Sequence, residues 1–315
     1  MPDMDTVAVV MEGPERLSLR RLALQSFAPD DVIVDIEYSG ISTGTERLLW
    51  TGRMPAFPGM GYPLVPGYES VGRVIDAGTN AKGRIGDTVF VPGASCFKDA
   101  RGLFGGAARR LIVPSVRAIS IHEKVREQGV LIALAATAQH AISSGSSPPR
   151  LIVGHGVLGR LLARLTIAAG HPAPTVWEKN PARRGGAMGY EVVDPTSDER
   201  RDYESIFDVS GDSEILDSLI ARLARCGEIV LAGFYEKPLS FAFAPSFMRE
   251  ARIRVAAEWK PQELAATLES IESGRLSLDG LITHRMDAEK ASDAYPIAFG
   301  DTGCLKMILD WKGCA

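Results

Sequence analysis

The chain has 315 residues, of which 45% are hydrophobic and 23% are charged, and its formal net charge is −4. These values are ordinary for a globular protein, and they exclude the strongly basic surface that a nucleic-acid-binding protein needs. The length predicts two domains, because a single hydrophobic core stops growing at about 250 to 300 residues.

No segment of the sequence favours a membrane or a disulfide framework. Its apolar runs are shorter than the roughly 18 to 20 residues that cross a bilayer, and the start MPDMDTVAVVMEGPERL is acidic where a signal peptide is basic. We therefore expect a cytoplasmic protein without a membrane span. The cysteines form no C-x-x-C pair, which predicts free thiols. They are Cys96, Cys226, Cys304 and Cys314.

The first 122 residues alternate short β-rich runs with glycine and proline. The runs are TVAVVM, DVIVDIEYSGI, SVGRVIDAG, GDTVFVPG and RRLIVPS. This spacing predicts a small, mostly β domain over residues 1–122. The interval from Leu48 to Tyr68 is rich in proline, methionine and aromatic residues, and it predicts a long loop.

From Glu123 onward, predicted helices alternate with predicted strands. Residues 123–145 are typical of a buried helix, and RLIVGHGVLGRLLARLTIAAG runs from a strand through a glycine turn into a helix. Further strands are expected in APTVWEKN, YEVVDP, ESIFDVSG and EIVLAGF, with a helix in SEILDSLIARLARCG. The pattern predicts an α/β fold with a doubly wound parallel sheet, a Rossmann domain over residues 123–278.

The tail, residues 279–315, is expected to complete the first domain. It contains a helical segment and a last strand, CLKMILDW. The alternation in this strand suits an antiparallel sheet better than a buried parallel one.

A glycine motif follows the strand that ends at Val153 and opens a helix that runs to about Ala169. In that setting the first glycine allows a tight turn, the second lets a pyrophosphate approach the backbone, and the third lets helix and strand pack closely. The free N–H groups of the helix start favour phosphate. The motif therefore predicts a dinucleotide site, in which His155 is expected to anchor the loop rather than to catalyse. Its residues are Gly154, His155, Gly156, Val157, Leu158 and Gly159.

Glu178 ends the next predicted strand, about 20 residues further on, where a carboxylate accepts hydrogen bonds from a ribose diol. A carboxylate at this place repels a 2′-phosphate, so the cofactor NAD is favoured over NADP. Three basic residues close in sequence act in the opposite direction and favour NADP. They are Lys179, Arg183 and Arg184.

The motifs together resemble the medium-chain dehydrogenase/reductase superfamily. They are YSGISTGTE, PLVPGYESVGRV, GDTVFVPG, AATAQHAI, LIVGHGVLG and KMILD, and they span nearly the whole chain. The resemblance implies a GroES-like catalytic domain, a nucleotide domain, and a substrate bound in the cleft between them. It also implies that Thr137 faces the nicotinamide. Members are often dimers or tetramers, so a homo-oligomer is expected, with the sheet extended across two subunits near GEIVLAGF and YEKPLSFAF.

Within the superfamily, residues 38–74 resemble the bacteriochlorophyllide a dehydrogenases of bacteriochlorophyll synthesis. This resemblance implies a tetrapyrrole substrate, whose 3-(1-hydroxyethyl) group is oxidised to a 3-acetyl group while NAD takes the hydride. Without this resemblance, composition and motif spacing predict only a nicotinamide-dependent oxidoreductase.

The sequence departs from the metal pattern of the superfamily at two places. Zinc-dependent members carry a cysteine in a G-I-C stretch and a histidine in G-H-E, where this chain has Ser42 and Tyr68. Neutral serine and phenol are poor zinc ligands beside thiolate and imidazole. We therefore expect no catalytic metal. Glu69 alone does not make a zinc site and is expected to form a structural hydrogen bond or ion pair.

Without zinc, a positioned hydroxyl or imidazole must take or share the alcohol proton as hydride leaves. Imidazole titrates near about 6.5, which makes His140 the best-matched base, although a lone histidine on an alanine-rich helix is more often a satisfied core or interface residue. Tyr68 is the other leading candidate, with the alternative that its ring caps a pocket wall. The full set of catalytic candidates is Ser42, Thr43, Thr45, Tyr68 and His140.

The predicted loop has the composition of a surface for a flat apolar ring. Aromatic side chains and adaptable methionines suit such a ligand. The alternative is that the loop folds onto its own domain and closes a core. The candidate substrate residues are Trp50, Met54, Phe57, Met60 and Tyr62.

Two other functions stay open at this point. One is a zinc-free quinone or enone reductase of the same superfamily, which normally uses NADPH, and assays with each cofactor separate it from the alcohol dehydrogenase. The other is a non-catalytic nucleotide-binding protein that lost its chemistry with the zinc ligands. The second alternative predicts nucleotide affinity without turnover of any alcohol.

Overall fold

The computed structural model describes residues 4–56 and 58–314, and the chain divides into two compact units. The first unit consists of residues 1–133 and 281–315, and the second of residues 134–280. The sequence placed the first boundary earlier, at residue 122. The difference arises because the 3₁₀ segment Glu123–Leu131 packs against strands of the first unit, β3 (Asp31–Ile41) and β5 (Ser70–Ala77).

The described part of the first unit is built on two sheets, in the strand orders β2-β1-β4-β7 and β16-β17-β3-β5-β6-β9, with β8 paired to β3. The apolar runs of β1 and β3 are buried, as their sequences predict. The remaining bounds are β1 Asp5–Gly13, β2 Arg16–Ala23, β4 Leu64–Val65, β6 Thr88–Val91, β7 Arg101–Gly102, β8 Arg110–Pro114, β9 Ile119–Ser120, β16 His284–Asp287 and β17 Met307–Asp310.

The tail returns to the first unit, as predicted. Strand β17 pairs antiparallel with β3, with Met307 opposite Ile41 and Ile308 opposite Gly40. It pairs in parallel with β16 on its other side, and helix α7 (Ala291–Gly300) precedes it. This pairing brings residues near the end of the chain next to the segment that follows β3.

The prediction of one long loop from Leu48 to Tyr68 is wrong at its start. Helix α1 spans Thr45–Trp50, and β4 forms a short strand within the interval. Leu48 and Leu49 are buried, so packing against the core favours a helical turn here despite the prolines that follow.

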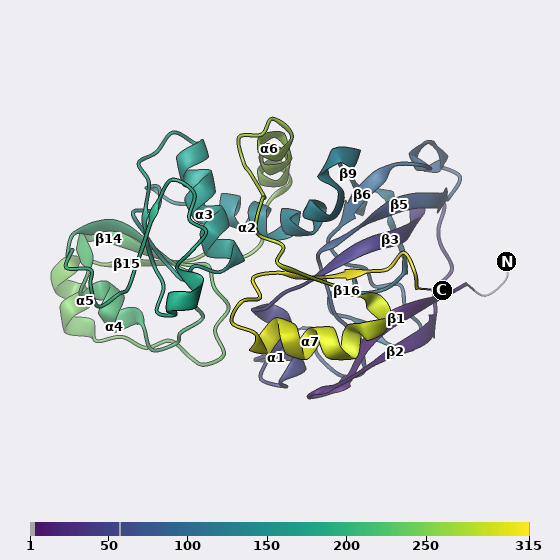
Figure 1. The fold of residues 1–315 in the computed structure, drawn as a ribbon, viewed down its shortest axis with the longest axis horizontal. Helices are drawn as coiled ribbons and strands as arrows, with labels where there is room; N and C mark the ends of the chain where they lie inside the picture. Colours follow the sequence, from purple (N-terminus) through teal and green to yellow (C-terminus); the bar gives the residue numbers. More distant parts are fainter. Residues whose placement is uncertain (1–3, 57, 315) are drawn as a thin grey trace. The chain divides into compact units, whose positions relative to one another are not determined.

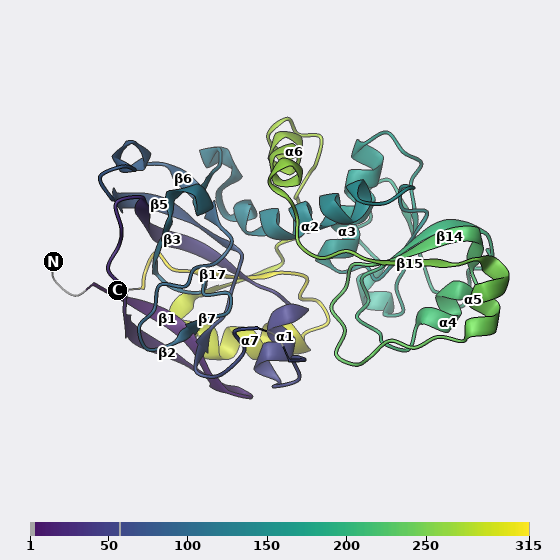
Figure 2. The same ribbon diagram turned by 180° about the vertical axis from the view of Figure 1, so that it is seen from behind.

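The second unit is a Rossmann fold, which confirms the predicted class. In the described residues its strands are all parallel and lie in the order β12-β11-β10-β13-β14-β15, which is the 3-2-1-4-5-6 order of dinucleotide-binding sheets. Helix α3 lies on one face of the sheet and helices α4 and α5 on the other (Figures 1 and 2). The strands are β10 Leu151–Val153, β11 Thr175–Trp177, β12 Glu191–Val193, β13 Tyr203–Asp208, β14 Leu223–Leu231 and β15 Arg252–Val255. The helices are α2 Ile132–Ser143, α3 Val157–Ala168, α4 Leu216–Ile220, α5 Phe243–Arg249 and α6 Pro261–Glu272.

Two helix predictions in this half of the chain need correction. The helix expected in SEILDSLIARLARCG is only α4, because from Leu223 the chain joins the sheet as β14. An irregularity in the β13–β14 register and a positive φ of 61° at Cys226 take up the extra residues, so sheet pairing overrides helix propensity. The helix expected from Glu123 begins only at Ile132, after a break at Arg126, whose φ is 48°.

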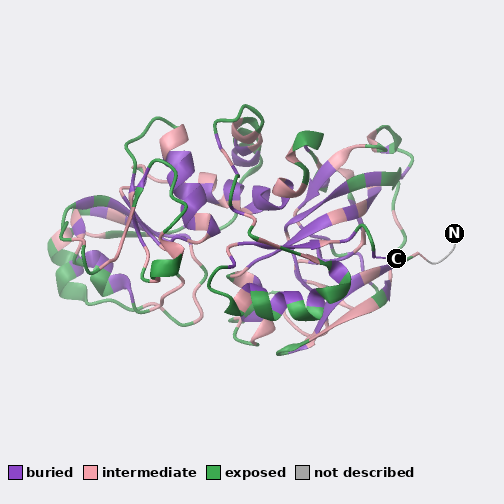
Figure 3. Cartoon of the chain, viewed as in Figure 1, coloured by how far each residue is buried: buried purple, intermediate pink, exposed green. Residues whose placement is uncertain are grey.

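Buried residues follow the central strands of each unit (Figure 3). The first core includes all of the segment Ala8–Met11, and the second is centred on β10, β13 and β14. Among the described residues, no helix is both long enough and apolar enough to cross a bilayer. The cysteines expected to be free are free thiols.

Candidate active site

Two strand ends bring Ser42 and Tyr68 together in the first unit. Ser42 follows the end of β3 and Tyr68 lies just before β5, and the backbone of Gly40 is hydrogen-bonded to that of Glu69 at 2.8 Å. The Ser42 Oγ and the Tyr68 hydroxyl oxygen are 2.6 Å apart, so these two hydroxyl groups share a hydrogen bond. The two positions that depart from the zinc pattern are therefore direct neighbours.

The Tyr68 phenol is held in its neutral form. Burial raises its pKa well above the usual value, the charge of Glu69 raises it further, and hydrogen bonds with Ser42 and Thr45 oppose the shift only in part. The ring of Phe104 meets the Tyr68 ring edge-on at a centroid distance of 5.2 Å. Tyr68 is thus suited to donate or share a hydrogen bond, and unsuited to act as a phenolate base.

The two threonine candidates differ in their relation to this pair. Thr45 begins α1 and hydrogen-bonds to Tyr68. Thr43 is partly buried in the preceding turn, and among the described contacts its side chain has no hydrogen bond to Ser42 or Tyr68.

A buried ion pair lies beside the hydroxyl pair. The Lys306 Nζ donates to the Glu69 Oε2 at 2.6 Å and to the Ile41 carbonyl oxygen at 3.2 Å, and both charged side chains are fully buried. The expectation that Glu69 forms an ion pair is thereby confirmed. Both ions have lost their water, so the pair adds little net stability. Its main effect is to tie the start of β17 to the strands next to Ser42 and Tyr68.

Glu46 is a second buried carboxyl group in the same place. Its Oε1 accepts from the backbone N–H of Ser42 at 3.1 Å, and its Oε2 accepts from the Tyr295 hydroxyl at 2.9 Å. Burial raises the pKa of Glu46 to about 8; the Ser42 hydrogen bond opposes this shift, and the charge of Glu69 adds to it. Near neutral pH this carboxyl group therefore retains a proton.

His140 belongs to the second unit, where it is hydrogen-bonded to a carboxylate. It lies on α2, and its Nδ1 is 2.9 Å from the Glu263 Oε2 on α6. The Ser143 hydroxyl donates to the other oxygen of Glu263 at 2.9 Å. This arrangement favours the alternative in which His140 is a structural residue whose ring is already hydrogen-bonded. The role of His140 as a base stays a prediction. Thr137 lies one turn earlier on the same helix.

The glycine turn of the second unit has the geometry that a dinucleotide requires. Gly154 has a φ of 105°, and a Cβ on Gly159 would meet the Gly154 carbonyl oxygen at 1.9 Å, so both positions need glycine. A Cβ on Gly156 would have no neighbour within 4 Å, which leaves the open side that a pyrophosphate can approach. Helix α3 begins directly after it, at Val157 and Leu158, with free N–H groups in its first turn.

Glu178 follows β11 at the edge of this turn. Its Oε1 accepts from the backbone N–H of Asn180 at 2.8 Å, and its Oε2 accepts from that of His155 at 3.2 Å. Each carboxylate oxygen has further lone pairs for ribose hydroxyls. Two of the three neighbouring cations are engaged by carboxylates, since Lys179 pairs with Asp212 at 3.3 Å and Arg184 pairs with Asp194.

The residues expected to bind a flat ring pack against their own unit. Trp50, Met54, Met60 and Tyr62 are partly buried against the first core, and Phe57 lies outside the described residues. The Trp50 ring lies 6.3 Å from that of Tyr295, and the Tyr62 hydroxyl donates to a backbone carbonyl. These contacts favour the alternative in which the segment closes the core, and a pigment surface here stays a prediction.

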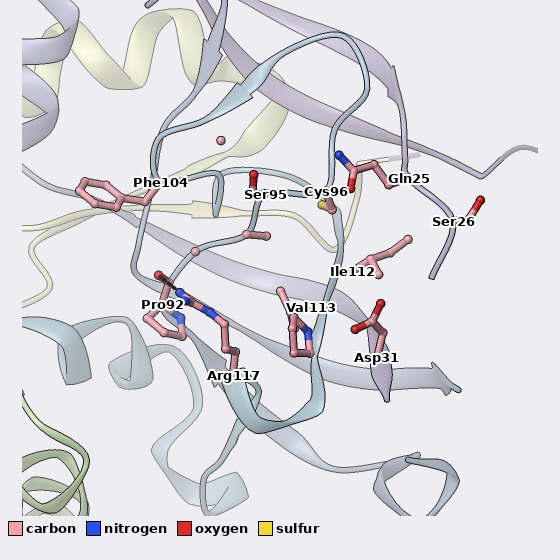
Figure 4. A pocket seen from close by; sticks show the side chains of 14 residues that line it. Gln25, Ser26, Asp31, Pro92, Ser95, Cys96, Phe104, Ile112, Val113 and Arg117 are labelled. Atoms are coloured by element: carbon pink, nitrogen blue, oxygen red, sulfur yellow. Dashed lines mark hydrogen bonds between the residues drawn. The ribbon is translucent and has the colours of Figure 1, made fainter. Parts of the chain in front are cut away.

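A cavity of about 460 Å³ opens in the first unit, and neither Ser42 nor Tyr68 lines it. Figure 4 shows the side chains around it, with Phe104 the one that also contacts Tyr68. Burial raises the pKa of the Cys96 thiol in its wall to about 11, so this thiol stays protonated and unreactive. Within residues 4–56 and 58–314, no three histidine, cysteine or acidic side chains are grouped to hold a metal ion.

Comparison with known proteins identifies the family of this chain. Residues 28–123 match the alcohol dehydrogenase GroES-like domain. The chain is 58% identical to the 2-desacetyl-2-hydroxyethyl bacteriochlorophyllide A dehydrogenase of Rhodobacter capsulatus, across 98% of this chain and 99% of that protein. It is 57% identical to the protein of the same name from Cereibacter sphaeroides, across 99% and 100%. The chain belongs to the bacteriochlorophyllide dehydrogenase family.

Solved structures of dehydrogenases share the fold of this chain. An alcohol dehydrogenase from Escherichia coli, crystallised with NADH, superposes with a TM-score of 0.84 at 20% identity, over 98% of this chain and 99% of that one. A zinc-binding dehydrogenase from Sinorhizobium meliloti, bound to NADP, gives 0.82 at 20% identity, over 98% and 100%. At 20% identity these comparisons show the fold alone. The two structures contain different cofactors, NADH in the first and NADP in the second.

Three buried residues near Ser42 and Tyr68 were not predicted from the sequence: Glu46, Tyr295 and Lys306. Glu46 stands in the quoted motif YSGISTGTE, and Lys306 stands in KMILD. The available signal was the antiparallel tail strand, because pairing it with the segment before Ser42 would have placed Lys306 near Glu69.

Proposed function

We propose that the protein oxidises the hydroxyethyl group of a bacteriochlorophyllide to an acetyl group, with transfer of hydride to NAD, in bacteriochlorophyll synthesis. The observation that carries this proposal is the 58% identity, over nearly the whole chain, to a dehydrogenase named for that substrate. The Rossmann unit with its glycine turn supports the nicotinamide part.

The hydroxyl pair of the first unit is proposed to handle the alcohol proton. When bound, the nicotinamide supplies the hydride acceptor. Ser42 and Tyr68 offer both a donor and an acceptor to the alcohol oxygen, so the alcohol proton can move through the two hydroxyl groups to bulk water, its final acceptor, while Tyr68 stays uncharged. Thr45 orients the phenol through its hydrogen bond. His140 and Thr43 remain candidates with less support.

We propose that this chemistry needs no zinc. The support is the donor set, since the hydroxyl groups of Ser42 and Tyr68 bond to each other where zinc-dependent relatives supply thiolate and imidazole. The product ketone is conjugated with the macrocycle, which makes the oxidation less demanding than that of an alkyl alcohol. Trp50, Met54, Met60 and Tyr62 are retained as a proposed pigment contact.

NAD is proposed over NADP on the strength of Glu178. Its carboxylate is held by two backbone N–H groups at the end of β11, where it would accept ribose hydroxyls and repel a 2′-phosphate. The cofactor choice is open to direct test because related folds bind either dinucleotide.

The test is to incubate the purified protein with hydroxyethyl bacteriochlorophyllide and either dinucleotide, with and without a chelator. We expect the absorption of the macrocycle to shift with NAD, whether or not chelator is present. No shift under any condition contradicts the proposal. Loss of the shift with chelator contradicts the metal-free mechanism, and NADPH-dependent reduction of quinones in place of alcohol oxidation supports the quinone or enone reductase.

We also propose a homo-oligomer formed through the edge of the Rossmann sheet. Residues 235–241, where the sequence led us to expect a sheet extension, contain no strand, and the edge strand is β15. The ribbon of α5 is largely exposed (Figure 3). Large apolar side chains of α5 and of the β15 end are exposed. The exposed fractions are 74% for Val255, 73% for Phe243, 72% for Met248 and 65% for Phe247.

Light scattering after size-exclusion chromatography tests this surface. We expect a dimer or larger assembly for the wild type, and a shift toward monomer for Phe243→Ser with Phe247→Ser. A monomeric wild type contradicts the proposal.

A further inference from the structure

His155, at the second position of the glycine turn, is fully buried and uses every polar group it has. Its backbone N–H donates to the Glu178 Oε2 at 3.2 Å, and its carbonyl oxygen accepts from the Arg160 Nε at 3.1 Å. Its ring Nδ1 lies 2.7 Å from the Arg183 carbonyl oxygen, and its Nε2 lies 2.9 Å from the Tyr190 hydroxyl. One residue thus joins the turn to four places in the chain.

The chemistry of the partners defines the protonation of this ring. The Arg183 carbonyl can only accept, so the His155 Nδ1 must carry the proton, and the Nε2 must accept from the Tyr190 hydroxyl. Burial lowers the pKa of His155 to about 4, which keeps the ring neutral near pH 7. The Tyr190 ring also packs edge-on against it at 5.6 Å.

Arg160 holds the same loop from the first turns of α3. Its side chain is buried, and it donates to the carbonyl oxygens of Gly186 at 3.0 Å, of Gly185 at 2.8 Å and of Arg183 at 3.1 Å. Gly186 has a φ of 78°, and a Cβ there would meet the Arg160 Nη1 at 2.6 Å. The loop is therefore seated directly on the guanidinium group.

These contacts restrict Glu178 before any ligand arrives. The loop leaves Glu178 and passes Arg183 to Gly186. It is bound to His155 of the glycine turn at Glu178 and Arg183, and to Arg160 of α3 at Gly186. Opening the loop to make room beside the ribose would break several buried hydrogen bonds at once. Such preorganisation favours the ligand that fits the closed arrangement.

We propose that His155, Arg160 and Tyr190 form a positioning network that holds Glu178 and the loop 179–186 closed around the adenosine ribose, and thereby sets the preference for NAD over NADP. The network does not touch the reacting atoms and acts through Glu178. This inference rests on the proposed function, in which a nicotinamide dinucleotide is the hydride acceptor.

The experiment compares Tyr190→Phe with a matched control, Tyr203→Phe. Each variant loses one hydroxyl group from a tyrosine in the second unit, and the Tyr203 hydroxyl donates to Asp198 at 2.8 Å, which belongs neither to the glycine turn nor to the loop 179–186. Titration of the full chain with NADH and with NADPH, followed by nicotinamide fluorescence, needs no pigment. Thermal unfolding checks that both variants are folded.

We expect Tyr190→Phe to weaken NADH binding about fivefold, the value of one neutral hydrogen bond, without weakening NADPH binding. In the pigment assay its KM for NAD should rise while its kcat stays within about twofold, because positioning affects binding. Tyr203→Phe should keep the NADH to NADPH ratio of the wild type. His155→Asn retains a donor for the Arg183 carbonyl but loses Tyr190, and its effect should not add to that of Tyr190→Phe.

Unchanged NADH to NADPH ratios in both Tyr190→Phe and His155→Asn overturn the network and leave the proposed dehydrogenase intact. Equal changes in Tyr190→Phe and Tyr203→Phe also overturn it, because the effect would then be structural. A wild type that binds neither dinucleotide removes the network together with the cofactor part of the proposed function. If Tyr190→Phe does not fold, the NADH to NADPH ratio of His155→Asn tests the network in its place.

Discussion

The hydroxyl pair of the first unit and the glycine turn of the second are organised in opposite ways. The glycine turn is local, since His155, Glu178 and Tyr190 are all within a few dozen residues of one another in the chain. The surroundings of Ser42 and Tyr68 are assembled from both ends of the chain, with Lys306 bonded to Glu69 and Tyr295 to Glu46. A local site can be inferred from a motif, whereas a site assembled from distant segments depends on sheet pairing.

The largest effect is expected where the assembled site holds its buried charge. Lys306→Met should cost about 3 to 5 kcal/mol of the free energy of unfolding, because Glu69 is left buried and unpaired. Chemical denaturation measures this loss. The double variant Lys306→Met with Glu69→Gln should recover much of it, and failure to recover would show that the pair is not the cause.

Removing one hydroxyl group separates chemistry from cofactor binding. Tyr68→Phe should lower kcat about 100-fold, the low end for a group that shares a proton in the reaction, and should leave the Kd for NADH unchanged. The control is Tyr38→Phe, whose hydroxyl is hydrogen-bonded to the Lys312 Nζ and which has no proposed role in catalysis or pigment binding. A Tyr68→Phe enzyme with more than half of the wild-type kcat would exclude the proposed relay.

Two glycine substitutions divide the roles within the local site. Gly159→Ala should cost about 1 to 3 kcal/mol of stability and also weaken NADH binding, since its Cβ would overlap the Gly154 carbonyl oxygen. Gly156→Ala should weaken NADH binding while stability stays nearly unchanged, because its Cβ points into open space. Denaturation and fluorescence titration measure the two effects, and equal loss of stability in both variants would contradict the assignment.

The smallest change, counted for each unit of pH, is the loss of stability that comes from Glu46. Its folded-state pKa is raised to about 8, so the folded protein binds more protons than the unfolded chain, and stability falls as pH rises from about 4.5 to 8. The slope is at most about 1.4 kcal/mol per pH unit for one proton. Denaturation of the wild type and of Glu46→Gln between pH 5 and 9 measures it by difference.

The wild type must be compared with Glu46→Gln because His155 changes the stability with pH in the opposite direction. Its pKa is lowered to about 4, so its contribution is present above about 6.5 and is lost as pH falls toward 4. Parallel curves for the wild type and Glu46→Gln would show that Glu46 does not titrate in this range.

Much of the fold could be predicted, because hydrophobic alternation and glycine spacing are properties of short segments. The parallel sheet, the strand, turn and helix around Gly156, and the antiparallel tail were all predicted in this way. The helix expected around Leu223 and the loop expected at Leu48 were wrong for the same reason. Both segments carry an ambiguous local pattern, and pairing or burial against distant residues decides it.

The sequence by itself determined the Rossmann turn, Glu178 beside it, and the exchange of zinc ligands for Ser42 and Tyr68, because each is a residue type at a short, fixed spacing. Only the tertiary structure decided that the two hydroxyl groups bond to each other, and that Glu46, Glu69 and Lys306 are buried beside them. It also decided which partners His155 uses for the anchoring role that the sequence predicts, the Arg183 carbonyl and the Tyr190 hydroxyl. The reason is physical: whether a charge is paired, and whether a hydroxyl keeps its proton, depends on partners that the chain supplies from far away.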